Sequence, residues 1–257
     1  MKTRNNIFSI IVILIVLQSC KKEDFSDISG FDDRFITYNS INDIFTNGNW
    51  TFHEKTYSEN TLTIVHDTVR SDTNSIRMFC VPGNGSLVSK SGLASHHKIL
   101  YKEGDIVKVS CWFYIPTNEG LNKLVILDLE DPAPISTGPG IRLMFDQDNA
   151  IFIERNKMGL SNITQNSGNK ILFPFNKWVN ITFELKLHTK SRGYIKLWQD
   201  GELIFDESSV TTLPRDRLYI TQGTHKSYSN IEVGITANST GHNIVMFIDD
   251  FSIWKIN

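Results

Sequence analysis

The sequence predicts an all-β protein folded as a sandwich of two antiparallel sheets. Apolar and polar residues alternate in many short runs, which is typical of strands with one buried face. Turn residues separate these runs at intervals of about ten residues, a spacing that favours a β-sandwich or barrel. Beyond residue 50 the sequence has no long stretch with the apolar periodicity of a helix.

Two runs show the alternation most clearly. Apolar residues occupy every second position over 179–187 and again over 107–115, so each run predicts a strand with one buried face. One short helix is expected over 40–45, shortly before Trp50. Further strands are expected at 62–69, 75–81, 123–130, 141–145, 151–153, 194–199, 203–205, 218–221, 231–237 and 244–255.

Two turns predict hairpins between neighbouring strands. Asp200-Gly201 separates the runs 194–199 and 203–205. An Asp-Gly pair suits a type I′ turn, because both central residues of that turn need a positive φ. The residues 146–149 join a second pair of strands in the same way.

Length and charge narrow the class of protein further. A chain of 257 residues suits one domain of this kind, because all-β domains reach about 250 residues. The 26 Lys and Arg residues nearly balance the 28 Asp and Glu residues, for a formal net charge of −2. Without a basic run we expect no nucleic-acid partner. We expect a monomer.

The N-terminus carries a targeting signal. Lys2 and Arg4 precede an apolar run over residues 7–17. This run is too short to span a membrane, for which about 20 residues are needed, but it suits the core of a signal peptide. The following Leu17-Gln18-Ser19-Cys20 resembles the lipobox of bacterial lipoproteins. The resemblance implies cleavage before Cys20 and lipidation of its thiol; the alternative is an ordinary secretory signal.

The resemblance to a lipoprotein sets the expected organisation. Residues 1–19 are expected to be the signal peptide, 20–33 a solvated tether, and 34–257 a single β-domain. The charged stretch after Cys20 resembles surface-export signals, so we expect an outer-membrane lipoprotein that faces the periplasm or the cell surface. The membrane is then touched only through the lipid. A disulfide is permitted there between Cys80 and Cys111, but their apolar neighbours favour two buried thiols.

Three segments near the C-terminus resemble a known fold family. These segments read GYIKLWQDGEL over 193–203, IEVGIT over 231–236 and FIDDFSI over 247–253. Together they resemble the concanavalin A-like jelly rolls, nearest the laminin-G-like modules and the heparin-lyase-I-like polysaccharide lyases. The resemblance extends over about residues 100–255. The alternative fold is a galactose-binding-like sandwich, suggested by Trp50 and the strand that ends at Trp112-Phe113-Tyr114.

Glycans usually lie on the concave outer face of one sheet in such a jelly roll. Aromatic rings stack on the C–H faces of sugars, and charged groups bind sugar hydroxyls. The outward positions predicted to line one such face are Asp128, Glu130, Arg142, Glu154, Tyr194, Lys196 and Trp198. The alternative is that these are ordinary polar residues of solvent-facing strands. Asp128 and Glu130 also match the spacing of a glycosidase pair, although a solvated or sugar-binding pair is favoured.

The lyase resemblance also implies a base and a cation. β-Elimination on a uronic-acid sugar needs a Tyr or His base and a group that neutralises the sugar carboxylate. Arg142 is a candidate for the neutralising group. No local motif selects the base, and the candidates are His97, Tyr101, His225 and Tyr228.

Asp249-Asp250 is the expected place for a metal. In carbohydrate-binding sandwiches an acid at the start of the last strand often holds a structural Ca²⁺ ion, which prefers oxygen ligands. The alternative is an aspartate in a turn or at a sheet edge. The seven histidines lack the spacing of zinc ligands.

Three functions remain open from the sequence. The favoured one is a lipid-anchored module of the cell envelope that binds polysaccharide on a concave sheet face. The alternatives are a polysaccharide lyase that cleaves uronic-acid glycans by β-elimination, and a structural or adhesion module without a glycan. The sequence therefore leaves open whether the protein is an enzyme.

Overall fold

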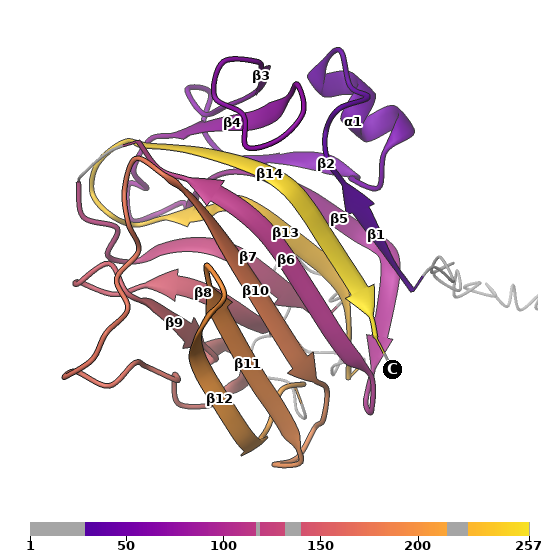
Figure 1. Cartoon of the computed structure of the whole chain (residues 1–257), viewed down its shortest axis with the longest axis vertical. Coiled ribbons are helices and arrows are strands. Elements are labelled where there is room, and N and C mark those ends of the chain that lie inside the picture. The colour runs from indigo at the N-terminus through magenta and orange to yellow at the C-terminus, as the bar shows by residue number, and fades with distance from the viewer. Residues whose placement is uncertain (1–28, 117–118, 132–139, 215–225, 257) are drawn as a thin grey trace, which may run out of the picture.

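The structure, a computed structural model, describes residues 29–116, 119–131, 140–214 and 226–256. These residues form two antiparallel sheets that pack face to face, which confirms the predicted β-sandwich (Figure 1). Four expectations lie outside the described residues: the expected signal peptide 1–19, the lipidation of Cys20, the expected strand 218–221 and the candidate base His225.

One sheet has eight strands. Seven of its strands follow one another in the order β12-β11-β10-β6-β14-β4-β3, and the eighth strand, β1, pairs with β14. In Figure 1 this sheet lies toward the viewer. Its strands are β1 Gly30–Asp33, β3 Thr61–Val65, β4 Ser75–Cys80, β6 Ile106–Tyr114, β10 Trp178–Lys186, β11 Gly193–Gln199, β12 Glu202–Val210 and β14 Ile244–Lys255.

The other sheet has six strands in the order β2-β5-β13-β7-β8-β9. All of its neighbouring strands run antiparallel. Its strands are β2 Phe52–Lys55, β5 Ser89–Lys102, β7 Leu124–Glu130, β8 Gly140–Phe145, β9 Ile151–Glu154 and β13 Ser227–Asn238.

The hydrophobic core fills the space between the two sheets. The alternating residues of β10, including Phe183, are fully buried on its inner face, as their periodicity predicts. Gly234 of β13 has a φ of 107°. A Cβ atom on Gly234 would collide with the side chain of Met78 on the facing sheet. The glycine therefore lets the two sheets approach closely at this point.

The predicted turns and the predicted helix are present. Asp200 and Gly201 have φ values of 50° and 83°, as a type I′ turn requires. The helix α1 spans Ile41–Asn47. The Asp43 carboxylate accepts the backbone N–H of Ser40 at 2.8 Å, which satisfies a donor at the start of the helix.

Two expectations about the first half of the chain are corrected. Gly30–Asp33, expected to be tether, form β1 and pair with β14. The Asp33 carboxylate accepts hydrogen bonds from Trp50 Nε1 at 2.8 Å and from the Tyr38 hydroxyl at 3.0 Å, so these residues belong to the fold. The strand β5 was not predicted, because small and polar residues interrupt its alternation.

Two further findings concern the cysteines and the helices. Cys80 and Cys111 are free and buried, as their apolar neighbours favoured. Burial raises the pKa of the Cys80 thiol to about 11. Within the part of the chain that the structure describes, no helix combines the length and the apolar character needed to cross a membrane.

Candidate functional site

A row of charged side chains crosses the outer face of the six-stranded sheet. Asp128 of β7 lies opposite Glu232 of β13 on one side and opposite Arg142 of β8 on the other. Arg142 in turn lies opposite Glu154 of β9. Directly opposed residues share one face of a sheet, so the register brings these four side chains together.

Arg142 is the centre of this row. Its Nε atom lies 2.5 Å from Asp128 and 3.7 Å from Glu154, and its Nη2 atom lies 3.8 Å from Glu130. Burial raises the pKa of Asp128 and of Glu154, and the charge of Arg142 opposes that rise. The four residues Asp128, Glu130, Arg142 and Glu154 therefore form one cluster, as the sequence predicts for a shared face.

Two lysines extend the cluster. Lys157, from the short 3-10 helix Asn156–Met158, places Nζ 2.6 Å from Glu130. Lys90 of β5 places Nζ 2.9 Å from Glu232 and 3.6 Å from Glu54 of β2. Burial alone would raise the pKa of Glu232, but His96 and Lys90 hold it below its usual range.

A groove of about 290 Å³ lies over the row, above β7, β8 and β13. Its charged lining consists of four cations and two carboxylates, an excess of two positive charges (4 − 2) in the lining itself. Glu54 and Glu232 pair with Lys90, and Glu154 pairs with Arg142, from outside the lining. The groove combines this excess with apolar walls, so it suits a ligand that is anionic and also has apolar surface. The lining residues are Val88, Lys90, Lys123, Val125, Asp128, Glu130, Arg142, Met144, Lys157, Thr236, Ala237 and Ser239.

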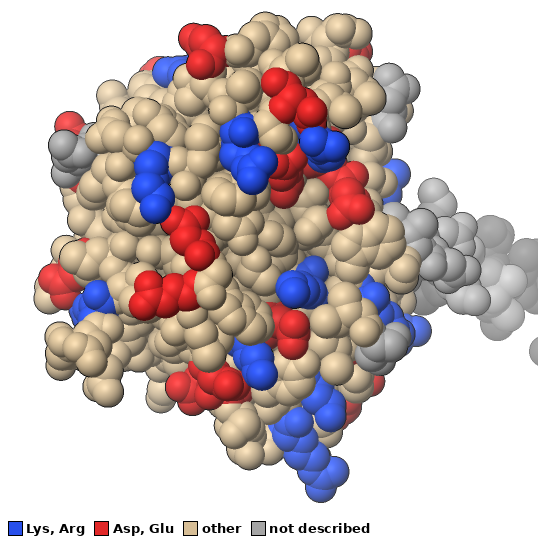
Figure 2. Space-filling view, in the orientation of Figure 1, with Lys and Arg blue, Asp and Glu red and all other residues tan. Residues whose placement is uncertain are grey.

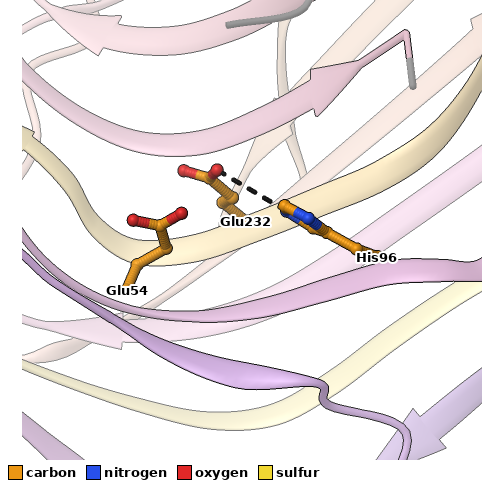
Figure 3. Close-up of side chains that lie close together, drawn as sticks. All are labelled: Glu54, His96 and Glu232. Carbon is orange, nitrogen blue, oxygen red and sulfur yellow. Dashed lines mark ion pairs between the residues drawn. The ribbon is translucent and has the colours of Figure 1, made fainter. Parts of the chain in front are cut away.

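His96 lies at the β5 side of the row (Figure 3). Its Nε2 atom is 3.8 Å from Glu232 Oε1, and the Phe52 ring packs edge-on against the imidazole at 4.7 Å. The ligand atoms of Glu54, His96 and Glu232 all lie within 4.8 Å of one another. Two carboxylates and an imidazole suit a divalent metal. The Lys90 ammonium group already pairs with both carboxylates.

The sequence analysis did not select His96, because the strand that carries it has no regular alternation. The sequence analysis did select Tyr101 and Tyr228 as candidate bases, and the structure corrects both assignments. Tyr101 and Tyr228 are buried in the core, where they donate hydrogen bonds to the carbonyls of Ser29 at 3.3 Å and Thr212 at 2.6 Å. A general base must reach the proton it removes, so buried tyrosines do not serve a glycan in the groove.

His97 is the remaining described candidate for the base. It follows His96 in β5 and has a positive φ of 60°. The two imidazole rings are perpendicular, with their centroids 6.3 Å apart. The imidazole of His96 contacts the charged row through Glu232.

The predicted glycan-binding residues fall into two separate groups. Tyr194, Lys196 and Trp198 point outward from β11, as their alternation predicts. However, β11 belongs to the eight-stranded sheet and Arg142 belongs to the six-stranded one. The expectation that they line one face together is therefore wrong. Alternation identifies the outward side of a strand but does not identify the sheet that the strand joins.

The two aspartates of the predicted calcium site are engaged with protein donors. Asp249 accepts backbone N–H groups from Arg70 at 3.0 Å and Ser71 at 3.2 Å. Asp250 accepts the Ser71 hydroxyl at 2.9 Å and pairs with the guanidinium groups of Arg34 and Arg70. Two guanidinium groups do not suit a calcium site, and these contacts anchor the loop before β4. Calcium at this place stays a prediction.

The structure thus defines a β-sandwich of two antiparallel sheets with a charged groove on the outer face of one of them. The family model described as "Polysaccharide lyase" matches residues 43–252, so the chain belongs to the polysaccharide lyase family. This supports the lyase alternative over a module that only binds. No curated protein matches the chain.

Several solved structures share the fold. An endo-β-1,4-glucuronan lyase from the fungus Trichoderma reesei is 15% identical, with a TM-score of 0.62 over 80% of this chain and 91% of that one. A cellulose-induced protein is 17% identical, with a TM-score of 0.59 over 87% and 96%. An alginate lyase from Chlorella virus is 11% identical, with a TM-score of 0.53 over 86% and 100%. At these identities the likeness establishes the jelly-roll fold.

Proposed function

We propose that this protein cleaves a uronic-acid polysaccharide by β-elimination on the outer face of the six-stranded sheet. The observation that carries the proposal is the excess of cations in the groove of a chain from the polysaccharide lyase family. Each uronic-acid residue carries a carboxylate, which such a groove attracts. Two of the similar structures are named as lyases of glucuronan and of alginate.

The reaction assigns distinct roles to the charged residues. A base removes the proton at C5, the C4–O4 bond breaks, a C4–C5 double bond forms, and O4 leaves with a proton. A cation at the sugar carboxylate stabilises the negative charge that develops next to C5. Arg142 already pairs with three carboxylates, so we assign it the role of positioning them. The neutralising role falls to Lys123, which lines the groove and has no ion pair with any residue that the structure describes.

We assign the base to His96. A neutral imidazole can accept a proton at its free ring nitrogen, which is the task of a general base. Lys90 lines the groove and pairs with Glu232, which in turn lies 3.8 Å from His96. His96 does not line the groove itself, but its side chain is 24% exposed, so we propose that the bound glycan extends from the groove past Lys90 and reaches the imidazole. The Glu232 carboxylate orients the ring.

The test is the absorbance of the unsaturated product on incubation with polyglucuronate, polygalacturonate and alginate. We expect one of these glycans to give product. His96→Gln should lower kcat by about a hundredfold or more, the usual contribution of a general base. His188→Gln is the matched control, because His188 also contacts a glutamate, Glu103 at 2.9 Å, but lies beyond the end of β10. Product from none of the glycans, or full activity in His96→Gln, would overturn the proposal.

A second candidate function is binding without cleavage. The observation that favours it is the burial of Tyr101 and Tyr228, which leaves the described groove with no tyrosine in its lining. The two functions differ in one measurement. A binder retains an acidic glycan in affinity electrophoresis and gives no unsaturated product.

We also propose that the mature protein is anchored to the outer membrane through a lipid on Cys20. The support is the apolar run 7–17 followed by Leu17-Gln18-Ser19-Cys20. Mass spectrometry of the mature N-terminus tests this. A lipidated Cys20 is expected, and an unmodified N-terminus at any other residue would contradict the anchor.

A further inference from the structure

The outer face of the eight-stranded sheet carries four of the chain's five tryptophans. Trp50 is buried in the core. The side chains of the other four tryptophans point to the outer face of this sheet. They are Trp112 and Trp198, each between two buried neighbours, and Trp178 and Trp254, each at or near the end of its strand. Large exposed apolar patches mark interaction sites, so indole rings gathered on one face of a sheet point to a ligand.

One of these tryptophans, Trp178, belongs to a row of aromatic rings over β6, β10 and β14. The Tyr114 ring lies 5.6 Å from Trp178 and 5.7 Å from Phe247, so an aromatic row crosses three neighbouring strands. Trp112 lies two residues from Tyr114 on the same strand. From the strand spacing, its Cα lies about 8 Å from that of Trp178, so both indoles border the same patch of surface.

A shallow hollow of about 500 Å³ lies between these two indoles. Trp112, Trp178, Asn180, Asp200 and Gly201 line it. The Asp200 carboxylate accepts the backbone N–H of Asn180 at 2.8 Å. The Asn180 amide donates to the Ser110 hydroxyl at 3.0 Å and accepts the Thr182 hydroxyl at 2.9 Å, so hydrogen bonds fix both polar side chains that line the hollow. Aromatic faces beside an amide and a carboxylate match the C–H faces and the hydroxyls of a sugar ring.

The charge on this face is balanced, unlike the charge in the groove. Asp200 pairs with Lys177 at 2.8 Å, and Lys196 lies 3.8 Å from Asp206. Figure 2 shows this face with basic and acidic residues intermingled and without a patch of one sign. A ligand of this hollow therefore gains little from carrying charge, whereas the groove on the other sheet favours an anion.

We propose that the outer face of the eight-stranded sheet is a second glycan-binding surface, which holds an uncharged polysaccharide in the hollow between Trp112 and Trp178. The two sheets turn their outer faces to opposite sides of the sandwich, so this surface is separate from the groove. It would hold the protein on a neutral glycan while the groove remains open to an acidic one. The proposal does not depend on cleavage in the groove.

The experiment is affinity electrophoresis, with calorimetry for the glycan that binds, against neutral β-glucans, xylans and mannans and against alginate. We expect the wild-type protein to bind at least one neutral glycan. Trp112→Ala and Trp178→Ala should each weaken that binding at least tenfold. Trp112→Tyr should restore most of it, because the ring is kept.

Trp254→Ala is the matched control. Trp254 is 38% exposed on the same sheet, outside the hollow, and its indole N–H donates to Asp32 at 2.8 Å. Its removal should leave binding of the neutral glycan unchanged. Activity or binding toward uronic oligosaccharides should be the same in the Trp112 and Trp178 variants as in the wild type, which separates this surface from the groove.

Three results would overturn the proposal. One is a wild-type protein that binds no neutral glycan. Another is an equal loss of binding in Trp254→Ala and Trp112→Ala, measured on variants whose thermal unfolding matches that of the wild type. The third is a dimer in light scattering that Trp178→Ala dissociates, because the face would then bind a second copy of the chain.

Discussion

Replacing Arg142 by methionine should destabilise the protein strongly. The change keeps a long side chain but leaves Asp128, Glu130 and Glu154 without their shared guanidinium group. These carboxylate side chains are only 4%, 9% and 10% exposed. Removing one partner of a buried ion pair costs about 3–5 kcal/mol. For a chain of this size, that free energy corresponds to a fall in Tm of about 6–20 °C.

The loss should depend on pH, with a sign set by the carboxylates. Burial raises the pKa of Asp128, Glu130 and Glu154 above the unfolded values, and Arg142 opposes the rise. Without Arg142 these folded-state pKa values rise further. A carboxyl group with a raised folded pKa stabilises the fold while it is protonated and loses that contribution as the pH rises through the folded pKa. The deficit of Arg142→Met should therefore be largest above pH 7 and shrink toward pH 5.

The assay is urea unfolding followed by tryptophan fluorescence, at several pH values between 5 and 8. Lys177→Met is the control, because Lys177 is 56% exposed and its pair with Asp200 is worth about 0–1 kcal/mol. The reasoning is refuted if Arg142→Met costs no more than the control at pH 7. It is equally refuted if the cost does not change between pH 5 and 8.

Three other outcomes are expected. Phe183→Ala should lower the free energy of unfolding by about 3–5 kcal/mol because it opens a cavity at a fully buried position, and Trp198→Ala should lower it much less because Trp198 is half-buried. The reverse order in urea unfolding would contradict the assignment of Phe183 to the inner face and Trp198 to the outer face. Thiol reagents should modify neither Cys80 nor Cys111 in the native protein, and peptide mapping that finds either one labelled before unfolding would contradict their burial. Asp33→Ala should lower the free energy of unfolding by about 1–3 kcal/mol for each of the donors Tyr38 and Trp50 that is left without an acceptor. A Tm equal to the wild-type value would contradict the place of Asp33 in the fold.

Local periodicity accounts for much of what the sequence predicted. The alternation in 179–187 predicted both a strand and its buried side, because successive side chains of a strand point to opposite faces. Asp200-Gly201 predicted its hairpin, because few other pairs accept two positive φ values. The same parity placed Asp128, Glu130, Arg142 and Glu154 on one face, and the structure adds Glu232 and Lys90 to them.

The sequence by itself determined most of the strands, most of their faces and the class of sandwich. The tertiary structure alone decided which strands share a sheet, and so separated Trp198 from Arg142 and buried Tyr228 in the core. It also brought His96, from a strand without alternation, to Glu232 across about 140 residues of chain. Strand pairing depends on contacts between distant segments, which the pattern within one segment does not contain.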